Sequence, residues 1–159
     1  MNKERWLSLV LVLLQFALCI LIVGNVGWSA LNDGDFRIRQ VTLRDVIACS
    51  CIVFGALLGL WSWWAIGITR LRIMPEPGAK TQLITAGPYK KIRHPMYAGL
   101  LLMMLGLLIL DTTWVNGIAW CCLYIVLDRK AAREEVFLSQ FFDEYHSYRQ
   151  RTGRFFPRA

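Results

Sequence analysis

Long uncharged runs dominate the pattern of hydrophobic and polar positions along the chain. The first run extends from Trp6 to Leu31 and the second from Val46 to Thr69. Each exceeds the ~20 residues that a helix needs to cross the hydrocarbon core of a bilayer. The basic start, Met1 to Arg5, resembles that of a signal peptide, but the apolar run behind it is too long for one. The two runs therefore predict two transmembrane helices within residues 1–69, the first of them uncleaved.

Small residues recur at helical spacing inside the second run. Ala48, Cys51, Gly55 and Gly59 form one stripe, and the two glycines make a GxxxG pair. In lipid, small residues let two helix backbones approach closely. The stripe predicts that the second helix packs against the first or the third.

Two shorter apolar runs follow, from Met96 to Leu110 and from Val115 to Leu127. Each is somewhat short for an upright crossing, so we interpret them as a tight helical hairpin. The hairpin either thins the bilayer or is extended at its inner ends by the residues that flank the two runs.

The last segment changes character. One helical face carries Glu134, Leu138, Phe141, Tyr145 and Tyr148, and polar residues lie largely opposite. This pattern predicts an amphipathic helix that continues from the fourth span and ends near Gly153. The expected fold is an all-α polytopic membrane protein with about four transmembrane helices and a C-terminal amphipathic helix, in a single domain over residues 1–159.

Composition and charge agree with a membrane protein. Hydrophobic residues make up 56% of the chain, and the net charge of +7 is concentrated in short segments beside the apolar runs. Such segments suit an anionic cytosolic leaflet better than nucleic acid, so no nucleic-acid partner is expected. With four spans, the N-terminus, the loop 70–95 and the C-terminal segment share one side and hold 2, 6 and 7 of the 18 Lys and Arg residues. The positive-inside rule then places both termini in the cytosol.

The sequence does not predict a metal site. The five cysteines all lie inside apolar runs without CxxC spacing, and the chain has only two histidines. We interpret the cysteines as small packing residues. Met103 and Met104 are expected to be packing residues too, Tyr145 and Tyr148 to be interfacial anchors, and His146 to be solvated.

Candidate chemistry gathers in the loop 70–95 and just beyond the fourth span. Pro95 suits the first turn of a helix, which makes His94 the N-cap, and a helix N-terminus favours an anionic ligand group. Glu134 shares the apolar face of its helix with Lys130 and is expected to point inward. The alternative role is structural: an interfacial salt bridge from Glu134 to Lys130 or Arg93 that anchors the hairpin.

Three segments of the chain together resemble the isoprenylcysteine carboxyl methyltransferase family. They are Leu83-Ile84-Thr85-Ala86-Gly87-Pro88-Tyr89, then Arg93-His94-Pro95-Met96-Tyr97-Ala98-Gly99, then Glu134-Glu135 followed by Phe141-Phe142 and Tyr145. The related phospholipid N-methyltransferases are similar. The resemblance covers about the last 80 residues and implies S-adenosylmethionine as cofactor. The residues that it implies for cofactor binding are Thr81, Gln82, Leu83, Ile84, Tyr89, His94, Pro95, Met96, Tyr97 and Glu134.

Lys130 departs from the family pattern. Eukaryotic members place a substrate-binding arginine there, and lysine keeps the charge but loses the bidentate fork for a carboxylate. Lys130 is therefore a candidate for orienting the substrate. The departure predicts an acceptor other than an isoprenylated protein C-terminus.

The leading prediction is an S-adenosylmethionine-dependent methyltransferase that acts on a lipophilic or amphiphilic acceptor at the membrane–cytosol interface, among membrane lipids. Methyl transfer from a sulfonium needs alignment and exclusion of water more than acid–base groups. Two alternatives stay open: an NADPH-dependent membrane reductase of sterol-reductase-like architecture, and a non-enzymatic membrane scaffold or accessory subunit. The oligomeric state is left open.

Overall fold

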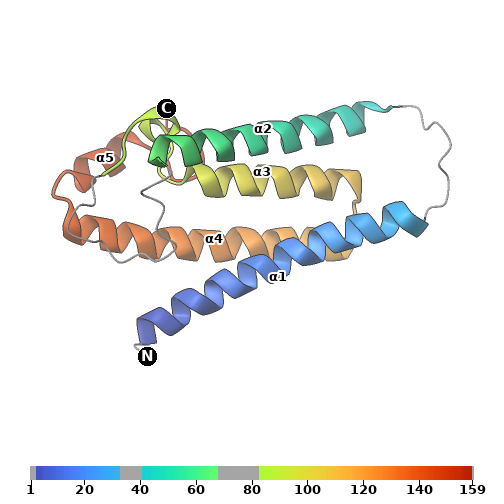
Figure 1. Cartoon of the computed structure of the whole chain (residues 1–159), viewed down its shortest axis with the longest axis horizontal. Helices are drawn as coiled ribbons and strands as arrows, with labels where there is room; N and C mark the ends of the chain where they lie inside the picture. Colours follow the sequence, from blue (N-terminus) through green and yellow to red (C-terminus); the bar gives the residue numbers. More distant parts are fainter. Residues whose placement is uncertain (1–2, 33–40, 68–82, 159) are drawn as a thin grey trace.

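A computed structural model describes residues 3–32, 41–67 and 83–158 and places them in five α-helices and one 3-10 helix (Figure 1). In chain order the elements are α1 (Lys3–Asn32), α2 (Leu43–Ile66), η1 (Gly87–Lys90), α3 (Pro95–Leu110), α4 (Trp114–Phe141) and α5 (Tyr145–Arg151). The predicted all-α class is confirmed. The four longer helices run side by side along the long axis, and η1, α5 and the C-terminus gather at one end.

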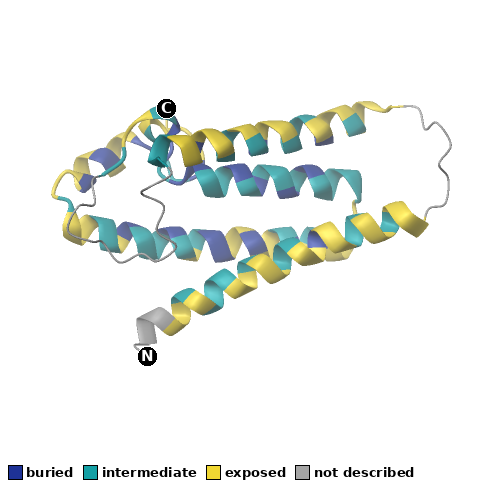
Figure 2. Ribbon diagram, viewed as in Figure 1, coloured by how far each residue is buried: buried dark blue, intermediate teal, exposed yellow. Residues whose placement is uncertain are grey.

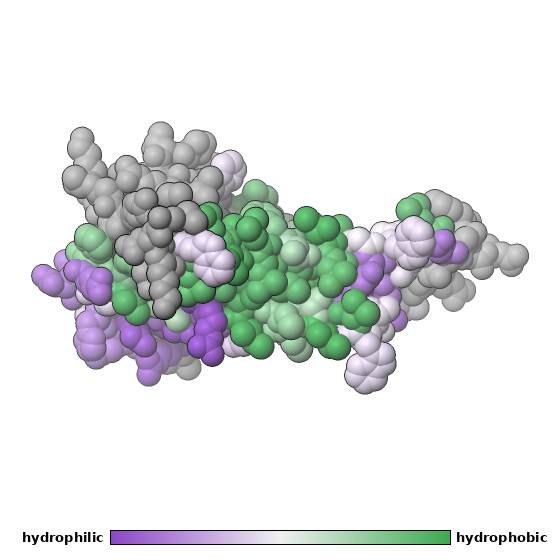
Figure 3. All heavy atoms as spheres, turned by 90° about the horizontal axis from the view of Figure 1, so that it is seen from below, coloured by the Kyte–Doolittle hydropathy of each residue, from purple (hydrophilic) through white to green (hydrophobic). Residues whose placement is uncertain are grey.

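Two of these helices are long and apolar enough to cross a membrane. They comprise Trp6–Asn32 in α1 and Leu43–Ile66 in α2. Exposed residues occur along the whole length of both helices (Figure 2), and hydrophobic residues cover the middle of the face shown in Figure 3. Exposed apolar side chains of this kind are expected where lipid is the solvent. α3 is apolar but has only 16 residues, so the four-span arrangement stays a prediction.

Glycines let α2 and α3 pack closely. A methyl group built on Gly55 would lie 2.6 Å from the carbonyl oxygen of Gly99, and one on Gly106 would lie 2.6 Å from that of Ala48. Backbone-to-backbone contact this close requires glycine. The small-residue stripe therefore faces the third helix, one of the two partners predicted for it.

Polar pairs join α1 to α4. Nδ2 of Asn25 donates to Oδ1 of Asn116 at 3.2 Å, and Nζ of Lys130 donates to Oε1 of Gln15 at 2.8 Å. Gln15 and Asn25 are the strongly polar residues of the first apolar run. Because unpaired polar groups are costly in an apolar environment, these pairs fix how α1 lies along α4.

At the end away from the C-terminus, helix caps satisfy free backbone groups. Thr42 and Asp45 form a capping box at the start of α2. The guanidinium of Arg44 donates from Nε to the carbonyl of Ile109 at 2.5 Å and from Nη2 to that of Leu110 at 3.0 Å, which caps the last turn of α3. The caps tie the start of α2 to the end of α3.

The C-terminal segment corrects two predictions. The amphipathic helix is not continuous, because α4 ends at Phe141 and the chain turns before α5 begins at Tyr145. Tyr145 and Tyr148 are buried rather than anchored at an interface. The turn lets α5 fold back, so that the tyrosine hydroxyl of Tyr148 donates to the carbonyl of Tyr89 at 2.7 Å. Met104 is buried in the core and His146 is exposed, as expected.

Candidate active site

The candidate site lies where α3 begins. His94 is the N-cap of α3 and Pro95 occupies its first turn, as predicted. The segment before it pairs with the C-terminal tail, residues 152–156: the amide of Arg93 donates to the carbonyl of Gly153 at 2.8 Å, and the amide of His94 to that of Arg154 at 3.0 Å. The tail thereby holds the backbone at the N-cap.

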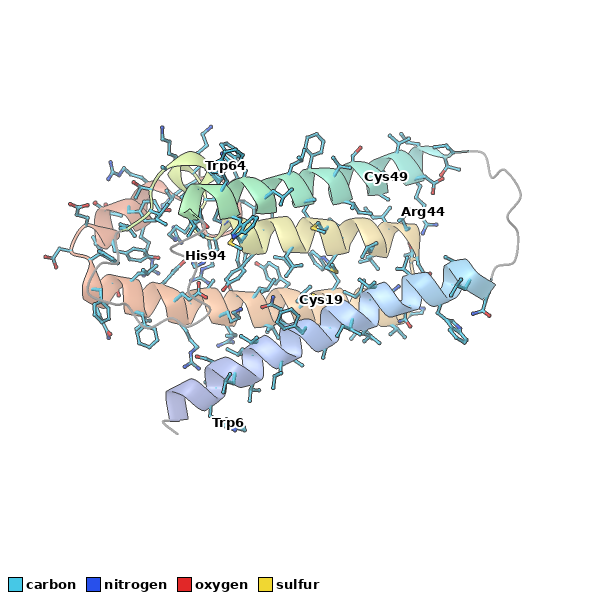
Figure 4. The ribbon with its side chains drawn as sticks, in the orientation of Figure 1. Trp6, Cys19, Arg44, Cys49, Trp64 and His94 are labelled. Atoms are coloured by element: carbon cyan, nitrogen blue, oxygen red, sulfur yellow. The ribbon has the colours of Figure 1, made fainter. Side chains whose placement is uncertain are left out.

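His94, Tyr97 and Glu134 form the centre of the site. Nδ1 of His94 lies 3.4 Å from Oε2 of Glu134, and the hydroxyl of Tyr97 donates to Oε1 of the same carboxylate. The His94 and Tyr97 rings lie parallel with their centres 5.5 Å apart. Figure 4 shows His94 between the start of α3 and α4. The His94 side chain is 7% exposed and that of Glu134 is 34% exposed, so the glutamate is the accessible member.

Glu135 has a different environment from its neighbour. Its side chain is 3% exposed and lies 3.0 Å from Nε of Arg93. Arg154 donates to both of its oxygens, from Nε to Oε1 and from Nη2 to Oε2, each at 3.1 Å. Glu134 does face inward, but Glu135 is the more deeply buried carboxylate. The salt bridge to Arg93 that the sequence offered as an alternative role for Glu134 is made by Glu135.

The charges in the site stabilise one another. Burial alone lowers the pKa of His94, but the carboxylates of Glu134 and Glu135 outweigh burial and raise that pKa above its ordinary value. Burial alone raises the pKa of Glu134, and contacts with His94 and Tyr97 more than reverse that effect. Burial likewise opposes ionisation of Glu135, yet His94, Arg154 and Arg93 hold the pKa of Glu135 well below its usual range. These contacts favour the charged form of both carboxylates and a protonated imidazole.

Lys130 extends the site towards α1. Its ammonium group lies 5.0 Å from the centre of the Tyr97 ring while it donates to Gln15. Burial lowers the pKa of Lys130, and the charge of Glu134 acts against that shift. A cation, an aromatic ring and a carboxylate thus lie together along one side of α4.

The structure describes most of the predicted site residues and brings several of them together. His94, Pro95, Tyr97, Lys130 and Glu134 gather at the start of α3 and along α4. Met96 follows in the first turn of α3, Tyr89 lies in η1, and Leu83 and Ile84 are half-buried just before η1. Thr81 and Gln82 lie outside the described residues.

Sequence reasoning missed four residues that hold the site: Gln15, Asp128, Arg154 and Phe155. Arg154 joins Glu135 to Asp128, whose Oδ1 lies 2.5 Å from Nη1 of the arginine. Two surface hollows of about 400 and 380 Å³ adjoin the tail, and Arg93 lines both. The one available signal was Gln15, a polar residue in an otherwise apolar run.

These features define a class: a helical membrane protein whose polar site sits at the N-terminus of an apolar helix. Residues 43–145, well over half of the chain, match the family model described as "Phospholipid methyltransferase". The chain belongs to this family of S-adenosylmethionine-dependent methyltransferases. The predicted resemblance is confirmed.

Individual relatives carry different names. The chain is 32% identical over 152 residues to "Cobalt-zinc-cadmium resistance protein CzcN" of Cupriavidus metallidurans, covering 92% of this chain and 61% of that protein. It is 33% identical over 92 residues to "Phosphatidylethanolamine N-methyltransferase B" of Dictyostelium discoideum, covering 53% and 43%. It is 24% identical over 162 residues to human "Protein-S-isoprenylcysteine O-methyltransferase", covering 98% and 57%. The chain thus spans about three fifths or less of the length of these relatives. Within the described residues, no group of three or more His, Cys, Asp or Glu side chains is placed to hold a metal ion.

Proposed function

We propose that this protein is an S-adenosylmethionine-dependent methyltransferase that acts on a lipophilic or amphiphilic acceptor at the membrane–cytosol interface. The observation that carries the proposal is the cluster of His94, Tyr97 and Glu134 at the start of α3. It combines an accessible carboxylate, a buried imidazole that favours its protonated form, and a helix N-terminus.

Four membrane spans would place this cluster on the cytosolic side. α3 and α4 turn back on each other at the end opposite the site (Figure 1), and most Lys and Arg residues flank the site. The positive-inside rule then puts the loop 70–95, both termini and the site in the cytosol, where the cofactor is available.

The residues present suit the charged end of the cofactor. The carboxylate of Glu134 is accessible enough to accept hydrogen bonds from an ammonium group. Nε2 of His94 is buried and lies 3.5 Å from Oε1 of Glu135 without forming a hydrogen bond within the described residues, and the positive charge of the protonated ring would favour a nearby carboxylate. The amides at the N-terminus of α3 add partial positive charge for the same anionic group. When bound, the cofactor supplies a methyl group on a positively charged sulfur.

The protein's own part in the reaction would be alignment and exclusion of water. Methyl transfer breaks a carbon–sulfur bond while the acceptor forms a bond to the same carbon in line, so an acceptor that arrives ionised needs no base. Lys130 lies one helical turn before Glu134 and beside Tyr97. It would orient the acceptor's polar end while the apolar helices contact its lipophilic part.

Titration calorimetry in detergent tests the proposal. S-adenosylhomocysteine and NADPH are titrated separately into the wild type, and only the first is expected to bind. His94→Ala and Glu134→Gln each remove a charge-assisted hydrogen bond, worth ~1.5–3 kcal/mol. We expect each to weaken S-adenosylhomocysteine binding roughly ten- to a hundred-fold.

The chain supplies a matched control for each change. His146→Ala removes the other histidine, which is exposed on α5, and Glu144→Gln changes an exposed glutamate whose side chain makes no cap hydrogen bond. Both controls should bind like the wild type. NADPH binding would indicate a reductase, and binding of neither ligand would indicate a scaffold. Unchanged affinity for S-adenosylhomocysteine in both site variants would indicate that Glu134 has only a structural role.

A further inference from the structure

We propose that Arg154 and Phe155, in the C-terminal tail, are positioning residues of the site: they fix the imidazole of His94 and, through it, the carboxylate of Glu134. The tail lies beyond residues 43–145, the part of the chain that matches the family model. The contacts of these side chains do not depend on the proposed function, whereas their effect on cofactor binding rests on it.

The backbone of the tail is joined to the segment that precedes α3. Ile92 and Gly153 form a parallel bridge. In addition to the hydrogen bonds that the amides of Arg93 and His94 donate to the tail, the amide of Gly153 donates to the carbonyl of Lys91 at 3.1 Å. Arg93 also donates from its guanidinium to the carbonyl of Thr152. A short tail with this many backbone bonds is part of the site's framework.

Arg154 ties the tail to α4 through side chains. Its planar guanidinium faces both oxygens of Glu135 and reaches Asp128 two turns earlier on the same helix. The two carboxylates raise the pKa of Arg154, with the hydrogen bonds that Arg154 donates to Glu135 as the main cause. Lysine could keep the charge at this position but could not make the three contacts.

Phe155 packs directly on the imidazole. Its side chain is 5% exposed, and its ring meets that of His94 edge-on at 6.4 Å and that of Tyr124 at 5.8 Å. Tyr97 lies parallel to His94. The imidazole is therefore fixed by aromatic contacts with Phe155 and Tyr97 and by the two glutamates.

These contacts form a continuous chain from the tail to the accessible carboxylate. Arg154 neutralises Glu135, Nε2 of His94 lies 3.5 Å from Oε1 of Glu135, and Nδ1 of His94 faces Glu134. The charged groups around His94 are these two glutamates, with Arg93, Arg154 and the exposed Arg149 acting through Glu135. Without Arg154, the negative charge of Glu135 is less neutralised and attracts the protonated His94 ring more strongly, so the ring should bind its proton more tightly.

Selective labelling can observe this effect directly, because the chain has two histidines. In detergent-solubilised protein with labelled histidine, nuclear magnetic resonance should show one imidazole signal for His94 and one for His146. Exposed His146 serves as the internal reference. The signals are titrated with pH in wild type, Arg154→Gln, Arg154→Lys and Phe155→Leu.

The last residue of α5 and the tail itself provide controls of the same residue types. Arg151→Gln changes an exposed arginine that bonds Ser147 within its own helix, and Phe156→Leu changes the neighbouring phenylalanine, which is 73% exposed. We expect Arg154→Gln to raise the pKa of His94, Arg154→Lys to restore it only in part, and Phe155→Leu to shift the His94 signal through loss of ring current. The controls should leave His94 unchanged, and His146 should be constant throughout.

Calorimetry on the same samples gives the functional readout. Arg154→Gln should weaken S-adenosylhomocysteine binding by about tenfold, the equivalent of one hydrogen bond to a charged group. If wild type does not bind the ligand, the proposed function fails while the resonance titration still tests positioning. A His94 signal that does not respond to Arg154→Gln overturns the inference. If that variant does not fold, Phe155→Leu decides on the same criterion.

Discussion

Two glycines on one helix offer a sharp test of the fold, because the structure assigns them different environments. Gly55 and Gly59 both lie within α2 and form the GxxxG pair. A methyl group on Gly55 would lie 2.6 Å from the carbonyl oxygen of Gly99, whereas a methyl group on Gly59 would meet nothing within 4 Å. Gly55→Ala and Gly59→Ala are thus the same chemical change with and without a backbone contact.

The opposing effects can be compared in magnitude. Replacing glycine by alanine inside a helix is favourable by about 0.8–1 kcal/mol, and this applies to both positions. Forcing extra volume into a packed interface costs about 1–3 kcal/mol. The backbone of Gly99 cannot rotate away as a side chain can, so the packing cost should prevail at Gly55. We expect Gly59→Ala to be neutral or stabilising and Gly55→Ala to be less stable than Gly59→Ala by about 1–3 kcal/mol.

Thermal unfolding in one detergent measures the difference. Tryptophan fluorescence is suitable because Trp61, Trp63 and Trp64 lie on α2 itself. For a chain of this size, each kcal/mol shifts Tm by about 2–4 °C. Equal Tm values for the two variants would show that α2 and α3 do not approach each other at Gly55.

Three further predictions concern charge, topology and substrate. Glu135→Ala should destabilise by about 3–5 kcal/mol in thermal unfolding, because it removes the buried carboxylate that pairs with both Arg93 and Arg154, whereas Glu134→Ala should cost less. The pKa of Glu135 is lowered in the folded state, so its contribution to the free energy of unfolding should be present above pH ~4.3 and lost as pH falls below it. If wild type and Glu135→Ala lost stability equally as the pH falls, this reasoning would be contradicted. A reporter fused after Ala159 should read cytosolic, and an extracytoplasmic signal would rule out the four-span arrangement. Methyl transfer to a farnesylcysteine analogue should be slower than to small lipids, because Lys130 lacks the arginine fork; comparable rates would refute that reasoning.

Much of the fold could be predicted from periodicity and local chemistry. The apolar runs gave the helices, and the residue pair His94-Pro95 gave the start of α3, because capping depends on neighbours in sequence. The stripe around Gly55 indicated close packing but left the partner open, since a single helix face does not specify which helix meets it. The structure selects α3.

The C-terminal segment shows where periodicity fails. Apolar spacing continues through Phe141 and Tyr145 as if the helix were unbroken, yet the chain turns between them. Burial of Tyr145 and Tyr148 against the site depends on tertiary contacts with η1 and Glu135, which no local pattern records. Arg154 was missed for the same reason, because its partners are distant in the sequence.

The adjacent glutamates explain why this small site needs so much supporting structure. Successive helix residues differ in direction by about 100°, so Glu134 can face an accessible space while Glu135 faces the tail. A partly buried carboxylate tends to bind a proton, since burial opposes its charge. His94 counters that tendency at Glu134 only while the ring is held in place, and holding it requires Glu135. Glu135 in turn is buried and needs cations of its own, which Arg93 and Arg154 supply. The ionic network is therefore the structural consequence of keeping one reachable carboxylate charged beside apolar helices.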